Sequence, residues 1–328
     1  MTTKDFIIKT AFMKKIFFLL ASGLFLYINS SAQDDPKGQN ETDSTTPVKT
    51  QKFTKNTFQG TSIINMHSIE IVPKNNMQFV ISHHFGVLWD KNQDAGQNLA
   101  QVLGINSGIA NTYLSLDYSV TDYANLGFAM TGNSKFEGWM KFKILRQQTG
   151  KKNIPVTIGW ISLANVDCQS NPADTIEENK LGWNKFTYMH QLLIARKFSD
   201  KFSLQLMPTL IHYNLVPYGY ENSNNVWSMG LGGKYQLTKN KALTFEYAHQ
   251  FNMYDNVISK TGAIINYYPN LVSLGIEFNT GGHIFQFYIG NTTAATNINQ
   301  LSKNVQLIKD GQFALGFRLN RNFFVGKE

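Results

Sequence analysis

The chain has 328 residues, a formal net charge of +8 and a single cysteine, and 13% of its residues are aromatic. One cysteine excludes an intramolecular disulfide, and so modest a charge over this length does not indicate a nucleic-acid partner. No apolar run after Tyr27 reaches the roughly 20 residues that a membrane-spanning helix needs, which excludes a helical membrane protein.

The N-terminal end predicts a secretory signal peptide over residues 1–32, with Met13 as an alternative start. Lys14 and Lys15 form a short basic beginning, residues 16–27 form an apolar run, and small residues precede Gln33. The apolar run is too short to span a membrane, so we expect a cleaved leader rather than an anchor.

A polar segment follows the leader. Residues 33–52 contain almost nothing that could enter a core, so they are predicted to be a disordered periplasmic lead-in. The folded part is expected over residues 53–328.

From there the dominant pattern is an alternation of apolar and polar residues in segments of about ten residues, the length of a tilted strand that crosses a bilayer. In residues 136–145, for example, Phe136, Met140 and Phe142 share one face and Lys141 and Lys143 share the other. The pattern predicts an all-β protein, a single up-and-down antiparallel transmembrane β-barrel.

Short turns alternate along the chain with longer connections, as they do between the periplasmic and extracellular rims of outer-membrane barrels. A first strand at residues 57–64, a turn near Asn65 and a last strand at residues 311–321 give about fourteen strands. Twelve is the alternative if an end segment is unpaired. An even number returns both termini to the periplasm.

Matching the apolar faces across each turn predicts the pairing of neighbouring strands. Phe278 should lie opposite Phe285 if Gly281 and Gly282 form a two-residue turn. In another hairpin, a loop of residues 239–241 should place Lys234 opposite Glu246, with opposite charges on the polar face.

The polar faces of the strands are expected to line the lumen, since lipid outside demands the apolar faces. Their charges are nearly balanced, which does not suggest strong ion selectivity. The interior could be an open channel or a self-paired, occluded network. The residues predicted to face the lumen are Gln78, Asp117, Glu137, Lys141, Lys143, Lys234, Glu246, Glu277 and Arg318.

One long connection carries a weak helical pattern. In residues 94–104, Leu99, Val102 and Leu103 recur at helical spacing. The segment is either a short helix folded over or into one mouth of the barrel, or a plain surface loop.

The segment GTSIINMHSIEIVPKNNMQFVISHHFG, residues 60–86, resembles the opening of a membrane-bound β-barrel domain family of unknown function from Gram-negative bacteria. The shared marks are the HSIE step at residues 67–70 and the isoleucine-x-His-x-Phe-Gly pattern at residues 81–86, and further similarity appears in the KFKILRQQ stretch. The family usually has Arg where this chain has His84. The resemblance implies the fold and a membrane location, but no reaction, substrate or catalytic residue.

No constellation of residues indicates catalysis. His67 and Ser68 are successive on a predicted strand and would point to opposite faces, as would His83 and His84, so neither pair could act together or chelate a metal. Cys168 has no CxxC-type partner. We therefore expect no enzyme activity, no catalytic residues, no cofactor and no metal.

Three functional hypotheses follow. The first is an integral outer-membrane barrel, porin-like, that acts as a passive pore or small-molecule channel. The second is an occluded structural or binding barrel without transport, and the third is an outer-membrane hydrolase. The expected partners are the lipid bilayer, the barrel-assembly machinery during insertion and a small solute, and the chain is expected to reach the outer membrane through its signal peptide.

Overall fold

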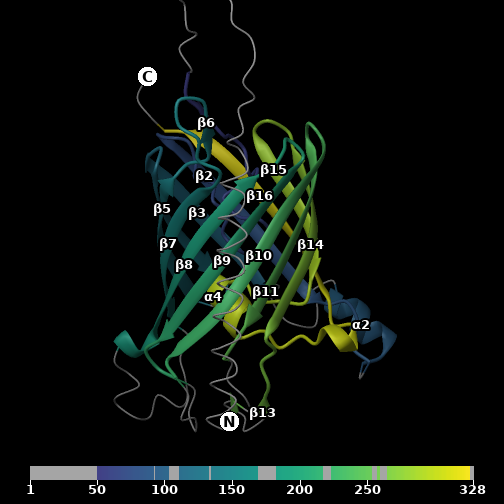
Figure 1. Ribbon diagram of the computed structural model, residues 1–328. Coiled ribbons are helices and arrows are strands. Elements are labelled where there is room, and N and C mark those ends of the chain that lie inside the picture. The colour runs from purple at the N-terminus through teal and green to yellow at the C-terminus, as the bar shows by residue number, and fades with distance from the viewer. Residues whose placement is uncertain are drawn as a thin grey trace, which may run out of the picture. The chain divides into compact units, whose positions relative to one another are not determined.

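The computed structural model describes residues 50–325 except 92, 103–110, 133, 169–181, 217–222, 253–256 and 259–263, so the predicted leader and most of the predicted lead-in lie outside the described residues. Twelve antiparallel strands form a closed barrel in which neighbours along the chain pair and the last strand pairs with the first (Figure 1). The strands of this wall are β2 (Asn76–Val87), β3 (Asn111–Thr121), β4 (Ala124–Thr131), β5 (Lys135–Leu145), β7 (Thr157–Asp167), β8 (Phe186–Lys197), β9 (Phe202–Tyr213), β10 (Asn225–Thr238), β11 (Lys241–Gln250), β14 (Asn270–Asn279), β15 (His283–Gly290) and β16 (Ala314–Phe324).

The barrel predicted from the alternation is confirmed, with twelve strands rather than fourteen. The prediction of a wall strand at residues 57–64 was wrong, because the wall begins at Asn76. The predicted turn near Asn65 is present, since the backbone N–H of Ile63 donates to the carbonyl of Met66 at 2.9 Å. That turn lies inside the barrel, as described below.

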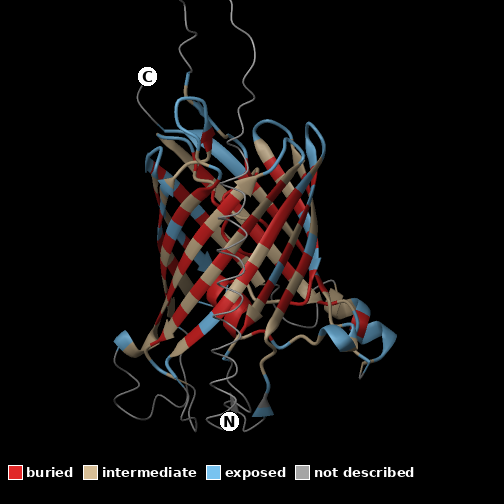
Figure 2. Cartoon of the chain, viewed as in Figure 1, coloured by how far each residue is buried: buried red, intermediate tan, exposed pale blue. Residues whose placement is uncertain are grey.

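The strands alternate between buried and partly exposed residues, most regularly in β8 and β9 (Figure 2). Large apolar side chains occupy the outer face, where Phe142 is 41% exposed and Leu274 is 59% exposed. Such a surface would be costly in water but is what hydrocarbon requires. The alternation in the sequence therefore reflects lipid outside and packed protein inside.

The two ends of the barrel differ. At the short-turn rim, connections of a few residues join β3 to β4, β8 to β9, β10 to β11 and β14 to β15, and β5 connects to β7 through β6 (Gln148–Thr149). Here β6 also pairs with β1 (Lys52–Phe53). At the long-loop rim lie the longer connections, which carry η2 (Gly182–Lys185), β12 (Val257–Ile258), β13 (Ile264–Ile265) and η3 (Ile308–Asp310).

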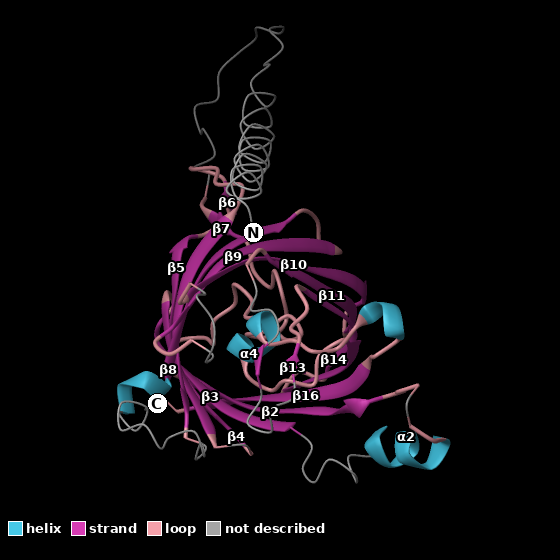
Figure 3. Cartoon of the chain, turned by 90° about the horizontal axis from the view of Figure 1, so that it is seen from below, coloured by secondary structure: helices cyan, strands magenta, loops and turns pink. Residues whose placement is uncertain are grey.

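The two helices belong to the long-loop rim but lie in different places. For residues 94–104 the sequence predicted either a short helix or a surface loop, and the structure has a helix there, α2 (Ala95–Val102). This helix lies outside the ring of strands (Figure 3). It lies close to β2, because a Cβ added at Gly86 would be 2.5 Å from the carbonyl oxygen of Gln101. Helix α4 (Asn297–Ser302) lies inside the ring.

The strand pairings test the predicted hairpins. Phe278 lies opposite Phe285, as predicted. The predicted pairing of Lys234 with Glu246 is wrong, since Lys234 lies opposite Thr244 and Glu246 lies opposite Gly232. A bulge between residues 236 and 238 and a tighter turn displace the strands by two residues. A displacement of two residues keeps both side chains on the inner face, so matching faces could not detect it.

Candidate functional site

The lumen is occupied by residues 54–72, which we call the N-terminal insert. Its side chains Phe58, Ile63 and Ile69 are at most 2% exposed. The insert folds back on itself, with an antiparallel bridge between Ser62 and His67. It hydrogen-bonds to strands on every side of the closed barrel, which only a segment inside the barrel can do. These contacts reach β2, β5, β9, β10, β11, β14 and β15.

Glu246 on β11 holds the turn of the insert. Its carboxylate accepts hydrogen bonds from the backbone N–H groups of Ile64, Asn65 and Met66, at 2.7, 2.8 and 2.9 Å. The Glu246 residue is only 1% exposed. The three N–H dipoles thus stabilise the negative charge of this buried carboxylate, which would otherwise need a cation beside it.

Lys141 on β5 holds the two arms of the insert together. Its Nζ donates to the carbonyl oxygens of Thr61, Ser68 and Glu70, at 3.0, 3.1 and 3.1 Å. Thr61 belongs to one arm, and Ser68 and Glu70 belong to the other. An ammonium group has three protons to donate, so these carbonyls use its full capacity. Lys141 is a buried charge that is satisfied by backbone oxygens.

Glu70 anchors the end of the insert. Its carboxylate forms an ion pair with Lys143 at 3.0 Å and accepts hydrogen bonds from the N–H groups of Thr57 and Phe58. Burial acts to raise the pKa of Glu70, but the Lys143 ammonium and the two N–H donors outweigh it and the pKa is lowered. The ionised carboxylate therefore ties the beginning of the insert to its end.

Apolar side chains of the insert pack against inward-facing apolar side chains of the wall. Ile63, Met66 and Ile69 belong to one buried hydrophobic cluster with residues of β7, β8 and β9. The wall makes room for them with glycine, since a Cβ at Gly232 would lie 2.4 Å from the Cδ1 of Ile63. The wall residues of β7, β8 and β9 in this cluster are Ile161, Leu163, Met189, Leu193, Ala195, Met207, Ile211 and Tyr213.

The remaining side chains that the sequence placed in the lumen are also buried, and most have an identified partner. Two of them bond to the insert: Gln78 accepts a hydrogen bond from Thr61, and Lys234 donates to the carbonyl of Asn56. Three carboxylates accept hydrogen bonds from neutral side chains of the wall, namely Asp117 from Trp139, Glu137 from Tyr113 and Glu277 from Gln286. Arg318 is 5% exposed, and in the described part of the chain its Nε and Nη1 have no hydrogen-bond partner. The charges therefore bind the insert and their neutral neighbours more than one another.

The insert itself is what sequence reasoning missed, although the sequence carries a signal for it. Ile63, Met66, Ile69 and Val72 recur every three residues, whereas a wall strand requires apolar residues at every second position. All four side chains are buried. The interruption of the alternation before Asn76 marks the boundary between insert and wall.

A second segment, residues 291–304, enters the barrel from the long-loop rim, and we call it the loop insert. Ile298 and Leu301 of α4 are buried in the same hydrophobic cluster as the N-terminal insert. Glu137 accepts hydrogen bonds from the backbone and side chain of Asn297. The hydroxyl groups of Ser302 and Tyr213 are hydrogen-bonded, and Asn291 and Asn304 both donate to the carbonyl of Asn270.

The spaces between the inserts and the wall differ in size. Beside the loop insert, a pocket of about 140 Å³ lies against Asn111, Thr131 and Lys135 of the wall. A cavity of about 10 Å³ lies among Thr61, His67, Asp117, Trp139 and Arg318. This is about the volume that a single water molecule needs. The N-terminal insert is therefore packed closely against the wall at this point.

Candidate metal ligands and the serine beside His67 can be located in the described part of the chain. Within that part, no three His, Cys, Asp or Glu side chains gather closely enough to hold a metal. The Ser68 hydroxyl donates to the carbonyl of Gly60, so it is used in the fold of the insert. Likewise, no helix in the described ranges is both long and apolar enough to cross a membrane.

A closed antiparallel barrel with an apolar outer face and buried charges inside defines a membrane-bound β-barrel. The chain belongs to the family described as membrane bound beta barrel domain (DUF5777), which matches residues 58–323. The resemblance seen in the sequence is thus confirmed. The match begins within the N-terminal insert, so the insert is part of the family's domain.

Solved structures similar to this chain include outer-membrane porins. The NanC porin is 8% identical, with 76% of this chain and 98% of that chain covered and a TM-score of 0.44. The KdgM porin is also 8% identical, with 76% and 99% covered and a TM-score of 0.42. The CymD monoaromatic hydrocarbon channel is 9% identical, with 77% and 89% covered and a TM-score of 0.32. Among curated proteins, no match is found.

Proposed function

We propose that this protein is an outer-membrane β-barrel whose lumen is occluded by its own chain and which acts as a structural or binding barrel in this state. The observation that carries the proposal is the pair of buried clamps, Glu246 on three backbone N–H groups and Lys141 on three carbonyls of the insert. Buried charges that are fully hydrogen-bonded hold a segment in one place. No catalytic step is part of the proposal.

A second candidate is a passive pore or small-molecule channel that opens when the N-terminal insert leaves. It is favoured by the wall itself, because many of the inward side chains that hold the insert are polar or charged. Without the insert, water would reach charged side chains of the wall, among them Lys141, Lys143, Glu246 and Glu277. A wall of this composition could be hydrated, as the interiors of open barrels are.

Planar-bilayer recording distinguishes the two candidates. We expect purified wild-type protein to insert without conductance steps, and steady conductance from the wild type would contradict occlusion. The double variant Glu246→Gln with Lys141→Met releases both clamps. Conductance steps from this variant alone would support the gated pore.

A deletion of residues 54–72 is the stronger version of the same experiment. Heat-modified migration in gel electrophoresis would first show that the deleted chain still forms a barrel. A folded deletion variant that remains silent at all voltages would exclude the pore and leave the structural or binding barrel. Asp122→Asn, in the exposed turn between β3 and β4, is a control that removes a charge without touching a clamp.

A further inference from the structure

The short-turn rim is strongly basic, and the long-loop rim is not. Among the described residues outside the wall strands, the connections of the long-loop rim carry Lys91, Lys185, Lys303 and Lys309 against Asp90, Asp94 and Asp310. At the short-turn rim, the turns and the incoming N-terminal segment carry Lys52, Lys55, Lys74, Arg146, Lys151, Lys152, Lys201 and Lys239 against Asp122 and Asp200. One end of the barrel thus presents a positive field to the solution.

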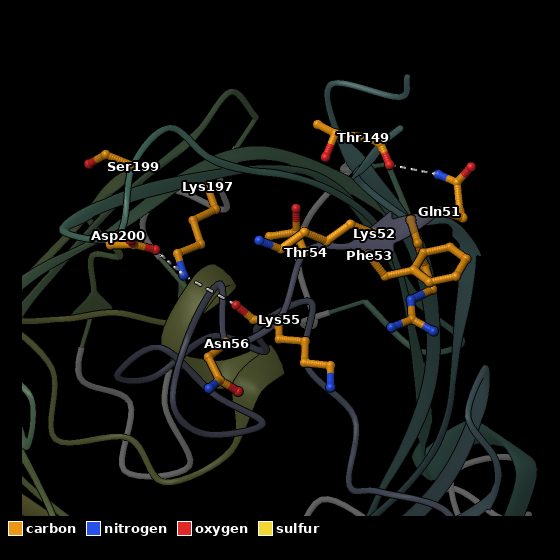
Figure 4. A pocket seen from close by; sticks show the side chains of 11 residues that line it. Gln51, Lys52, Phe53, Thr54, Lys55, Asn56, Thr149, Lys197, Ser199 and Asp200 are labelled. Carbon is orange, nitrogen blue, oxygen red and sulfur yellow. Dashed lines mark hydrogen bonds and ion pairs between the residues drawn. The ribbon is translucent and has the colours of Figure 1, made fainter. Parts of the chain in front are cut away.

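A pocket lies within this basic rim, over the mouth of the barrel. Its volume is about 850 Å³, which is in the range of small-molecule sites. Figure 4 shows Lys197 and Asp200 on one side of the open space, Thr149 with Gln51 on the other, and Lys55 between them. Its lining includes Lys52, Phe53, Lys55, Arg146, Lys197 and Asp200.

The charges of this mouth pocket are unbalanced. Four cationic side chains line it, and Asp200 is the one acid among the described lining residues. Asp200 pairs with Lys197 at 3.1 Å. No described carboxylate forms an ion pair with the other three cations, Lys52, Lys55 and Arg146. The pocket thus holds positive charge that no carboxylate in the described part of the chain neutralises.

Two of the four cationic side chains, Arg146 and Lys197, are held in place by the fold. The Arg146 guanidinium lies 4.5 Å from the ring centre of Phe53 and 5.8 Å from that of Tyr123. Lys197 donates to the carbonyl of Lys55 at 3.3 Å, which ties the wall to the N-terminal segment. Arginine stacked in this way retains its planar edge for two-point bonding to a carboxylate or phosphate.

We propose that the mouth pocket binds a ligand with two or more carboxylate or phosphate groups. The three unneutralised cations require more than one anionic group, and the volume accommodates a ligand of sugar-phosphate size. Such a ligand would touch both the wall turns and the segment that leads into the N-terminal insert. This binding site is independent of whether the lumen conducts.

Titration calorimetry with sodium tripolyphosphate tests the site, using the full chain in a zwitterionic detergent. We expect saturable binding to the wild type. The double variant Lys55→Gln with Arg146→Gln should weaken binding by at least about tenfold, since each charge-assisted hydrogen bond contributes about that much. Lys74→Gln with Lys239→Gln removes the same charge from the same rim outside the pocket and should change affinity less than about twofold.

Two results would overturn the proposal. One is the absence of saturable binding to the wild type. The other is an equal loss of affinity in both double variants, which would mean that the anion responds to the overall positive charge of the rim and not to a specific pocket. Unchanged melting temperatures in both variants show that the comparison concerns binding and not folding.

A further arm identifies the source of the anionic group. The titration is repeated in nanodiscs of phosphatidylcholine with and without phosphatidylglycerol. If phosphatidylglycerol weakens tripolyphosphate binding to the wild type but not to the Lys55 and Arg146 variant, the pocket binds a lipid headgroup. Unaltered tripolyphosphate affinity in both nanodiscs assigns it to a soluble polyanion.

Discussion

The two segments that fill the barrel are held by different forces. The N-terminal insert is packed by its apolar side chains and is also held through its backbone, whose N–H and carbonyl groups bond to Glu246, Lys141 and other polar side chains of the wall. The loop insert has one charged wall anchor among the contacts described above, Glu137, and depends more on the packing of Ile298 and Leu301 and on neutral hydrogen bonds. The first combines a polar clamp with apolar packing, and the second depends chiefly on packing and neutral hydrogen bonds.

This difference has consequences for movement. Polar contacts between a segment and a barrel wall can be exchanged for water when the segment leaves, whereas apolar packing cannot. Release of the N-terminal insert would therefore leave its polar clamps satisfied by water but would expose its apolar side chains, such as Ile63 and Ile69. The following substitutions test that difference, from the largest expected effect to the smallest.

Glu246→Ala should have the largest effect. It leaves the N–H groups of Ile64, Asn65 and Met66 without their acceptor, and we expect a loss of about 3–5 kcal/mol in the stability of the folded state. Thermal unfolding in detergent gives the stability, and hydrogen exchange locates the change. Exchange should accelerate in residues 60–70 and not in residues 297–302. Equal acceleration in both would mean that the inserts form one unit.

Leu301→Ala tests the other side of the comparison. Leu301 is 5% exposed, and its truncation should cost about 2–3 kcal/mol through the cavity it leaves. Here hydrogen exchange should accelerate in residues 297–302 and leave residues 60–70 protected. The exposed Leu99 of α2 provides the control, because Leu99→Ala removes the same atoms from a side chain that is 62% exposed.

Gly232→Ala examines the fit of the N-terminal insert to the wall. The added methyl group would lie 2.4 Å from the Cδ1 of Ile63, so Ile63 must move, at a cost of about 1–2 kcal/mol. Gly138→Ala is the matched control, since a Cβ there has no atom within 4 Å. A melting temperature that falls for Gly138→Ala as much as for Gly232→Ala would show that the effect comes from the strand backbone rather than from the insert.

Acid should loosen the N-terminal insert through Glu70, with the smallest effect of the four. The pKa of Glu70 is lowered in the folded protein, so its contribution to stability is present above the ordinary value of 4.5 and disappears as the pH falls through the lowered value. The difference in melting temperature between the wild type and Glu70→Gln should therefore shrink below pH 4.5. A difference that is the same at pH 7 and pH 4 would exclude this role for Glu70.

The period-two pattern was sufficient to predict the barrel. Lipid outside requires apolar residues and the interior accepts polar ones, so successive residues of a strand alternate between the two kinds. This alternation is visible in a single strand, such as residues 136–145. The same logic identified Lys141, Glu246 and Arg318 as inward-facing side chains, where the structure buries them.

The sequence could not determine the partners of those side chains. Lys234 and Glu246 appeared to pair because matching faces cannot distinguish registers that differ by two residues, and the bulge that decides the register follows from the whole sheet. The filling of the lumen was hidden for a related reason. The wall charges bind backbone N–H and carbonyl groups of the insert, which every residue carries, so only the folded chain shows where those groups converge.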